Sequence, residues 1–227
     1  KAVRRGIQKS FLLADMPFMS YQPSAECALI NAGRLMQEGG ADGVKLEGGV
    51  RILQQIEVLV TAGIPTVGHL GFTPQSKTRD YYLYSDGRGT VPKYQGKGPR
   101  GAKEILDEAL MLEDAGIFAI VLEQVTEEAA QVISQRLTIP TIGIGSGRYC
   151  DGQILVVNDL LGLNDDVPLP AKAYTSLNGK LRDIFIAYRR EVEAGQFPAG
   201  DNAVHMDPGK LQKFQELLGE KQEEQKL

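Results

Sequence analysis

Short apolar segments alternate with longer segments of helical periodicity along most of this chain. The apolar segments lie at residues 11–16, 43–47, 65–70, 118–123, 140–144 and 153–158. Between them, apolar residues recur three or four positions apart, as they do on helices that cover a sheet, at residues 24–37, 52–62, 102–115 and 127–137. This alternation predicts an α/β fold with a parallel sheet and right-handed crossover connections.

The number of units favours one parallel architecture over another. Six strand–helix units, and an opening at residues 1–6 that reads as the end of a helix, predict a (β/α)8 TIM barrel lacking its first two βα units. A doubly wound open sheet is the alternative. Against this alternative, no GxGxxG motif follows the first strand, and polar residues stand at the ends of many strands rather than at one switch point.

The predicted barrel leaves a polar segment inside it and a helical extension after it. Residues 77–98 are rich in Gly and Tyr and have no sustained periodicity, so we expect a long loop, either a functional lid or disordered. A long amphipathic helix is expected around residues 181–192. We assign residues 1–206 to an N-terminally incomplete catalytic barrel domain and residues 207–227 to a C-terminal helical tail that frays at its end.

Charge and composition exclude several classes of function. The net charge is −4 and the basic residues are dispersed, which argues against a nucleic-acid partner. No apolar run approaches the roughly 18 residues that span a bilayer. Cys27 and Cys150 lie far apart and outside any CxxC motif, so neither a zinc site nor a disulfide framework is expected. We expect a reducing compartment, the cytoplasm or, in a eukaryote, the mitochondrial matrix.

Polar residues stand at the carboxyl ends of four predicted strands: Asp15, Glu47, His69 and Glu123. Two positions earlier, on the same face of each strand, come Leu13, Lys45, Val67 and Val121. In a barrel such strand ends converge on one rim, where active sites of this fold are found. Each residue alone has a structural alternative: an ion pair, a helix cap or a satisfied core polar group.

The chemistry of these side chains suggests a metal-assisted reaction. Asp15 and Glu47 are candidate oxygen ligands for Mg²⁺, an ion that keeps several of its waters. Such a metal could hold a 2-oxo acid and stabilise the enolate formed by proton loss beside the ketone. Lys45 could neutralise the same oxygens, and Glu123 is a candidate general base. Composition does not name the substrate.

A glycine-rich segment at residues 143–147 permits two interpretations. Its backbone N–H groups could cradle a phosphate or carboxylate. The same glycines could simply form a tight turn between a strand and the next element. The sequence leaves both open.

Five sequence segments together resemble the ketopantoate hydroxymethyltransferase family. They are Ala-Asp-Met-Pro-Phe at 14–18 with Ser-Tyr at 20–21, Val-Lys-Leu-Glu-Gly-Gly at 44–49, Gly-His-Leu-Gly at 68–71 with Thr-Pro-Gln-Ser at 73–76, Val-Leu-Glu at 121–123, and Ile-Gly-Ile-Gly at 142–145 with Asp-Gly-Gln-Ile-Leu at 151–155. The resemblance runs from Lys1 to about Met206 and implies a (β/α)8 barrel related to the phosphoenolpyruvate mutase and isocitrate lyase group. It also implies a decamer that transfers a hydroxymethyl group from 5,10-methylenetetrahydrofolate to 3-methyl-2-oxobutanoate with Mg²⁺.

The resemblance also implies roles for individual residues. Asp15 would bind the metal directly and lie against the substrate, and Glu47 would hold the metal through water. Lys45 and His69 would contact the oxo acid, and Glu123 would remove its C3 proton. In the family, earlier strands supply a further metal-binding Asp and a substrate-contacting Ser, which these 227 residues lack. A carbon–carbon lyase acting on another 2-oxo acid and a non-catalytic pseudoenzyme subunit remain alternatives.

Overall fold

A computed structural model describes residues 1–76, 94–165 and 171–224 of the 227-residue chain. Its contacts divide the chain into two compact units. The first unit comprises Lys1–Leu160 and Asp166–Ala173, and the second comprises Leu161–Asp165 and Tyr174–Leu227. Most of the loop expected at 77–98, including Tyr81, Tyr82 and Tyr84, lies outside the described residues. The assignment of residues 1–206 to one catalytic domain stays a prediction.

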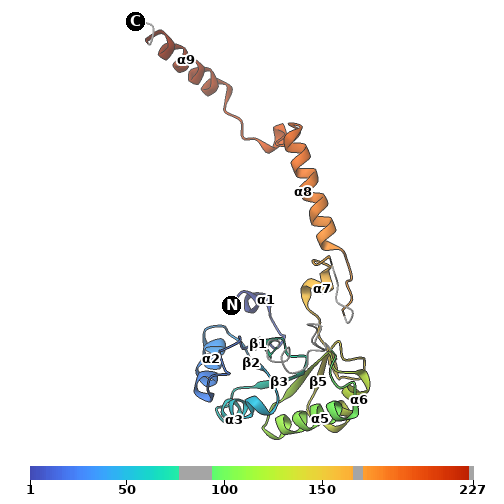
Figure 1. Ribbon diagram of the computed structural model, residues 1–227. Coiled ribbons are helices and arrows are strands. Elements are labelled where there is room, and N and C mark those ends of the chain that lie inside the picture. Colours follow the sequence, from blue (N-terminus) through green and yellow to red (C-terminus); the bar gives the residue numbers. More distant parts are fainter. Residues whose placement is uncertain (77–93, 166–170, 225–227) are drawn as a thin grey trace. The chain divides into compact units, whose positions relative to one another are not determined.

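The first unit is built on a six-stranded sheet in which every neighbouring pair is parallel (Figure 1). The strands are β1 Leu13–Asp15, β2 Gly43–Glu47, β3 Thr66–Gly71, β4 Ala119–Glu123, β5 Thr141–Ile144 and β6 Gly152–Gln153. Their spatial order is their order in the chain, as in a barrel wall. A doubly wound sheet reverses its strand order at a switch point, so that alternative is wrong for the described strands.

Helices follow the strands in the predicted alternation. They are α1 Ala2–Gly6, α2 Ala25–Gln37, α3 Leu53–Thr61, α5 Pro99–Asp114, α6 Glu127–Arg136 and α7 Val157–Leu161, with the 3-10 turns η1 Val50–Ile52 and η2 Pro74–Ser76. The hydroxyl of Ser24 caps α2 by accepting the Cys27 N–H at 3.1 Å. Figure 1 shows α2, α3, α5 and α6 arranged along one face of the sheet.

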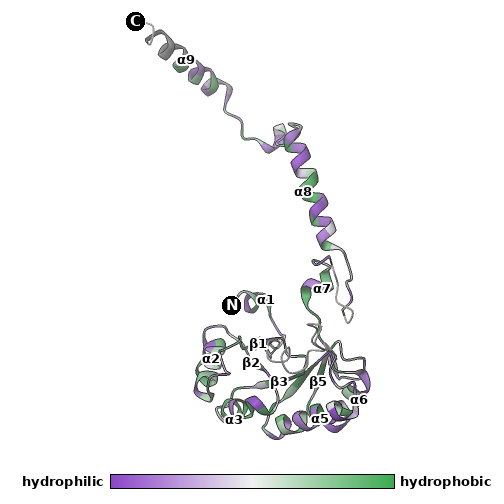
Figure 2. Ribbon diagram, viewed as in Figure 1, coloured by the Kyte–Doolittle hydropathy of each residue, from purple (hydrophilic) through white to green (hydrophobic). Residues whose placement is uncertain are grey.

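The two faces of the sheet carry different side chains. The helix-covered face contributes the larger core, which includes Val44, Leu46, Leu70, Ile120 and Leu122. The opposite face carries a small separate cluster of Val67, Ala119 and Val121, with Leu13, Ile142 and Ile144 packed against it. Figure 2 colours the strands as mainly hydrophobic. The polar strand ends therefore project from the face that holds the smaller cluster.

Two sequence expectations need correction. The first strand was expected to be buried, but β1 is only partly buried and the side chain of Phe11 just before it is 54% exposed, because β1 pairs with β2 alone. The segment at 153–158 was expected to be a strand throughout. Only Gly152–Gln153 pairs with β5, and α7 begins at Val157, since short apolar runs suit helices and strands alike.

The second unit contains α8 Leu177–Glu193, the 3-10 turn η3 Gly200–Asn202 and α9 Pro208–Glu224. The long helix expected around 181–192 is confirmed by α8, whose residues alternate in hydropathy (Figure 2). Five of its apolar side chains are exposed by more than a third: Leu181, Ile184, Phe185, Tyr188 and Val192. Within the described part of the chain, no helix combines the length and hydrophobicity that crossing a membrane requires.

A carboxylate in the last turn of α5 supports the turn that leads into β5, and its removal should lower stability in a pH-dependent way. One oxygen of Glu113 accepts hydrogen bonds from the Thr138 N–H (2.6 Å), the Thr138 hydroxyl (2.7 Å) and the Ile139 N–H (3.2 Å). Burial raises the pKa of Glu113, but these hydrogen bonds outweigh it and lower the pKa. The stabilisation is therefore present above the unfolded-state pKa and is lost as pH falls through the folded-state pKa.

We expect Glu113→Gln to lower the free energy of unfolding by about 1 kcal/mol at pH 7, because a neutral acceptor makes weaker hydrogen bonds. Thermal unfolding of both proteins from pH 7 to pH 3 would measure this difference, which should shrink as pH falls. Glu128→Gln, at an exposed position on α6, is the control. A difference that is the same at every pH would contradict the assignment.

Candidate functional site

The strand register brings all five predicted site residues onto one face at one end of the sheet. Asp15 on β1 lies opposite Lys45 on β2, and Glu47 lies opposite His69 on β3. Glu123 on β4 lies opposite Gly71, two residues beyond His69. The expected convergence of these strand ends is therefore confirmed, whereas the roles of the residues stay predictions.

Lys45 is the buried cation at this end of the sheet. Its side chain is only 10% exposed, and its Nζ lies 3.2 Å from Asp15 Oδ1 and 3.2 Å from His69 Nδ1. The Asp15 carboxylate at the other end of this ion pair is 66% exposed. Asp15 is thus accessible to a ligand, while Lys45 is held among polar partners at the base of the site.

The contacts of His69 determine which ring nitrogen carries the proton. An ammonium group has only donors, so Lys45 must donate to Nδ1 and the proton of the neutral ring must be on Nε2. Nε2 lies 3.2 Å from Glu123 Oε2, but the two atoms are not aligned as a hydrogen bond, and the buried Nε2 has no hydrogen-bond partner among the described residues. The Nε2–H group of this 3%-exposed side chain is therefore a donor available to a ligand.

Glu47 is held by residues from three different segments. Its Oε2 accepts the Gln75 N–H at 2.9 Å, and its Oε1 lies 3.7 Å from His69 Nδ1. Its backbone N–H donates to the Tyr21 hydroxyl at 3.1 Å. Burial raises the pKa of Tyr21 to about 12, so this hydroxyl is protonated at neutral pH. The Glu47 carboxylate is therefore fixed in place with one oxygen free of hydrogen-bond donors among the described residues.

The candidate metal ligands at this end of the sheet can be compared with the ligands that Mg²⁺, the predicted ion, prefers. Asp15 and Glu47 supply carboxylate oxygens from neighbouring strands, on the same face. Considering residues 1–76, 94–165 and 171–224, no group of three or more His, Cys, Asp or Glu side chains is placed to hold a metal. Two carboxylates suit Mg²⁺ when water and substrate oxygens complete its shell, so the residues fit a metal shared with substrate.

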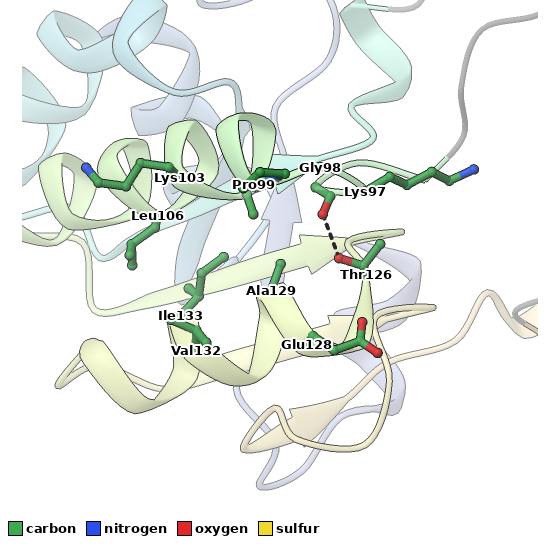
Figure 3. Close-up of a pocket in the computed structure, with 12 residues that line it drawn as sticks. Lys97, Gly98, Pro99, Lys103, Leu106, Thr126, Glu128, Ala129, Val132 and Ile133 are labelled. Carbon is green, nitrogen blue, oxygen red and sulfur yellow. Dashed lines mark hydrogen bonds between the residues drawn. The ribbon is translucent and has the colours of Figure 1, made fainter.

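Two of the hollows in the described part of the first unit border α5. One, of about 510 Å³, is lined by Gly48, Gly49, Leu70 and Gly71 together with residues of η1 and α5. The other, of about 450 Å³, lies between α5 and α6, where Leu106 and Ile133 face each other and Thr126 donates to the Gly96 carbonyl (Figure 3). None of the five predicted site residues lines either hollow.

The glycine-rich segment after β5 behaves as a structural turn. Gly145 and Gly147 have φ values of 65° and 78°, which glycine adopts readily. Between them, the fully buried Ser146 hydroxyl donates to the Leu122 carbonyl (2.7 Å) and accepts the Val125 N–H (3.0 Å). These contacts join the ends of β4 and β5 and favour the tight-turn interpretation of this segment.

Sequence reasoning did not assign any role to Tyr21 and Gln75, although both contact Glu47. Tyr21 lies in a bend and Gln75 in the short 3-10 turn η2, where neither helical nor strand periodicity predicts a contact. The proline at position 74 was the available signal, because a 3-10 turn there leaves the N–H of Gln75 free to bind a side chain. Their contact with Glu47 depends on the folded chain and could not be read from spacing.

A family model described as ketopantoate hydroxymethyltransferase matches residues 1–200. A protein from Clostridium beijerinckii named 3-methyl-2-oxobutanoate hydroxymethyltransferase is 45% identical over 94% of this chain and 75% of its own length. A protein of the same name from Pseudothermotoga lettingae is 50% identical over 89% of this chain and 73% of its own length.

Likeness to solved structures is weaker. A phosphonopyruvate hydrolase aligns with a TM-score of 0.43 and 11% identity, over 93% of this chain and 69% of its own. A likeness of this size does not assign a function.

Proposed function

The chain belongs to the ketopantoate hydroxymethyltransferase family, and we propose that the site on β1–β4 carries out this family's reaction through a metal-stabilised enolate. The chain is a hydroxymethyltransferase that converts 3-methyl-2-oxobutanoate into ketopantoate. The observation that supports this site is the contact of His69 with both Lys45 (3.2 Å) and Glu123 (3.2 Å) at the strand ends.

In our proposal each side chain acts on a different part of the oxo acid. Glu123 takes the C3 proton, and the Nε2–H of His69 donates to a substrate oxygen, which satisfies a buried donor that otherwise has no partner. Lys45 places a positive charge beside the oxygens on which negative charge develops. Asp15 and Glu47 would hold Mg²⁺, which would polarise the ketone when bound.

The one-carbon donor and the complete architecture are part of the same proposal. We assign 5,10-methylenetetrahydrofolate as the co-substrate, as the family's reaction requires. We also propose that the sequential parallel strands belong to a closed eight-stranded barrel, in which two further strands would lie between β6 and β1. A homo-oligomer, with a decamer as the expected size, is a further prediction.

Removal of the metal should stop the reaction. With 3-methyl-2-oxobutanoate and 5,10-methylenetetrahydrofolate, we expect ketopantoate to form with Mg²⁺ and to fall by at least 100-fold after chelation, because the enolate loses its counter-charge. Chromatographic detection of ketopantoate, with Mg²⁺ restored after chelation as the control, would measure this. Product formed at the same rate in the presence of excess chelator would contradict the metal assignment, and product formed without folate would contradict the donor assignment.

A further inference from the structure

Two polar residues outside the proposed set, one fully buried and one partly buried, connect three strand ends. Tyr21, between β1 and α2, is fully buried, and Gln75 lies in η2 after β3. The Tyr21 hydroxyl donates to Gln75 Oε1 at 2.7 Å and accepts the Glu47 N–H at 3.1 Å. Gln75 Nε2 donates to the Met16 carbonyl at 2.9 Å, one residue after Asp15. The pair thus links β1, β2 and the segment after β3.

The amide of Gln75 has a single orientation that satisfies its neighbours. Its Oε1 accepts from both the Tyr21 hydroxyl and Gln22 Nε2 (3.0 Å), and its Nε2 donates to a carbonyl. With its side chain fixed in this way, the backbone N–H of Gln75 points at Glu47 Oε2 at 2.9 Å. A flipped amide would place its NH₂ group against another donor and its oxygen against another acceptor. These hydrogen bonds therefore fix both the orientation of the side chain and the position of the backbone.

We propose that Tyr21 and Gln75 are positioning residues that fix the Glu47 carboxylate, and the β1 end that carries Asp15, for binding a divalent cation. This inference rests on the proposed function, because Asp15 and Glu47 are its candidate metal ligands. Gln75 occupies one oxygen of Glu47 and so directs the other toward the site. Tyr21 fixes the backbone of the same residue. Contacts of this kind hold a ligand ready before the metal arrives.

The placement of the pair distinguishes this role from simple packing. A buried phenol and a partly buried amide are costly unless their hydrogen bonds are made, and apolar side chains of similar size could fill the same space. Within the described part of the chain, the hydrogen bonds of the Gln75 side chain all go to the segment at 16–22 that follows β1. The backbone of Gln75 reaches the end of β2. The network therefore spans the two strands that bear the candidate ligands.

Direct metal binding tests the inference without relying on turnover. Gln75→Met removes the amide at similar length, and Tyr21→Phe removes only the hydroxyl. Titration calorimetry would give the Mg²⁺ dissociation constant in the presence of 3-methyl-2-oxobutanoate, alongside kcat, KM and thermal unfolding. We expect each variant to bind Mg²⁺ about 10-fold or more weakly than the wild-type protein. In the double variant, Mg²⁺ binding should weaken by less than the product of the two single-variant factors, because both residues act through one network.

Matched controls separate positioning from loss of structure. Gln54→Met, at an exposed position on α3, and Tyr188→Phe, on the exposed face of α8, make the same chemical changes elsewhere. If Gln75→Met and Tyr21→Phe lower the melting temperature but leave the Mg²⁺ dissociation constant at the wild-type value, the pair is structural only and the inference is overturned. If wild-type protein binds Mg²⁺ and the variants lose it, yet no ketopantoate forms, the inference stands and the proposed reaction fails.

Discussion

Replacing Glu123 with Gln should strongly slow exchange of the C3 proton of 3-methyl-2-oxobutanoate while leaving the fold intact. Glutamine keeps the size of the side chain but does not accept a proton at neutral pH, and general-base catalysis accounts for about 10²–10⁴ in rate. Glu123 is only 17% exposed and its Oε2 lies 3.2 Å from His69 Nε2, so no bulk buffer base can readily replace it. We therefore expect exchange to slow by about 1,000-fold.

Proton NMR in deuterated buffer, with Mg²⁺ and without folate, would follow this step apart from hydroxymethyl transfer. Glu57→Gln, an exposed change on α3, should exchange at the wild-type rate. Exchange that continues unchanged in Glu123→Gln would move the base to another residue. If the wild-type protein makes ketopantoate but shows no exchange without folate, proton removal requires the co-substrate to be bound first.

The strand–helix alternation was enough to predict the parallel sheet, because burial on both faces leaves a continuous apolar signal in central strands such as β4. The same signal fails at the edges. β1 and β6 each pair with one neighbour, so the residues around them are exposed or change to helix at Val157. Edge elements depend on what covers them, which sequence periodicity does not record.

Likewise, only part of the site could be predicted from the sequence. Residues at the ends of strands could be predicted, since strand phase places Lys45, Glu47 and His69 on one face. The contacts that orient them could not, because Tyr21 and Gln75 lie 26 and 28 residues from Glu47 and reach it from irregular segments. Nor could the sequence show that Nδ1 of His69 faces Lys45, which determines where the ring proton lies.

Replacing Gly71 with Ala should destabilise the protein and disturb the site at the same time. Gly71 ends β3 with φ of 94°, and a Cβ there would lie 2.2 Å from the Glu123 carbonyl oxygen and 2.7 Å from Val125 Cγ2. That carbonyl already accepts the Phe72 N–H at 2.8 Å, so β3 and β4 cannot separate without breaking this bond. We expect a loss of about 3 kcal/mol or more, from left-handed backbone strain together with the clash.

Gly33→Ala is the matched control, and we expect it to raise the stability of the protein instead of lowering it. Gly33 lies inside α2, and a Cβ there would meet no atom within 4 Å. Alanine in a helix interior is favoured over glycine by about 1 kcal/mol, so this variant should melt a few degrees higher. Thermal unfolding would give both shifts, and the exchange assay would show activity lost in Gly71→Ala alone. Equal melting temperatures for the two variants would mean that β3 and β4 tolerate a side chain at Gly71, and that the backbone between His69 and Glu123 is less constrained than its hydrogen bonds indicate.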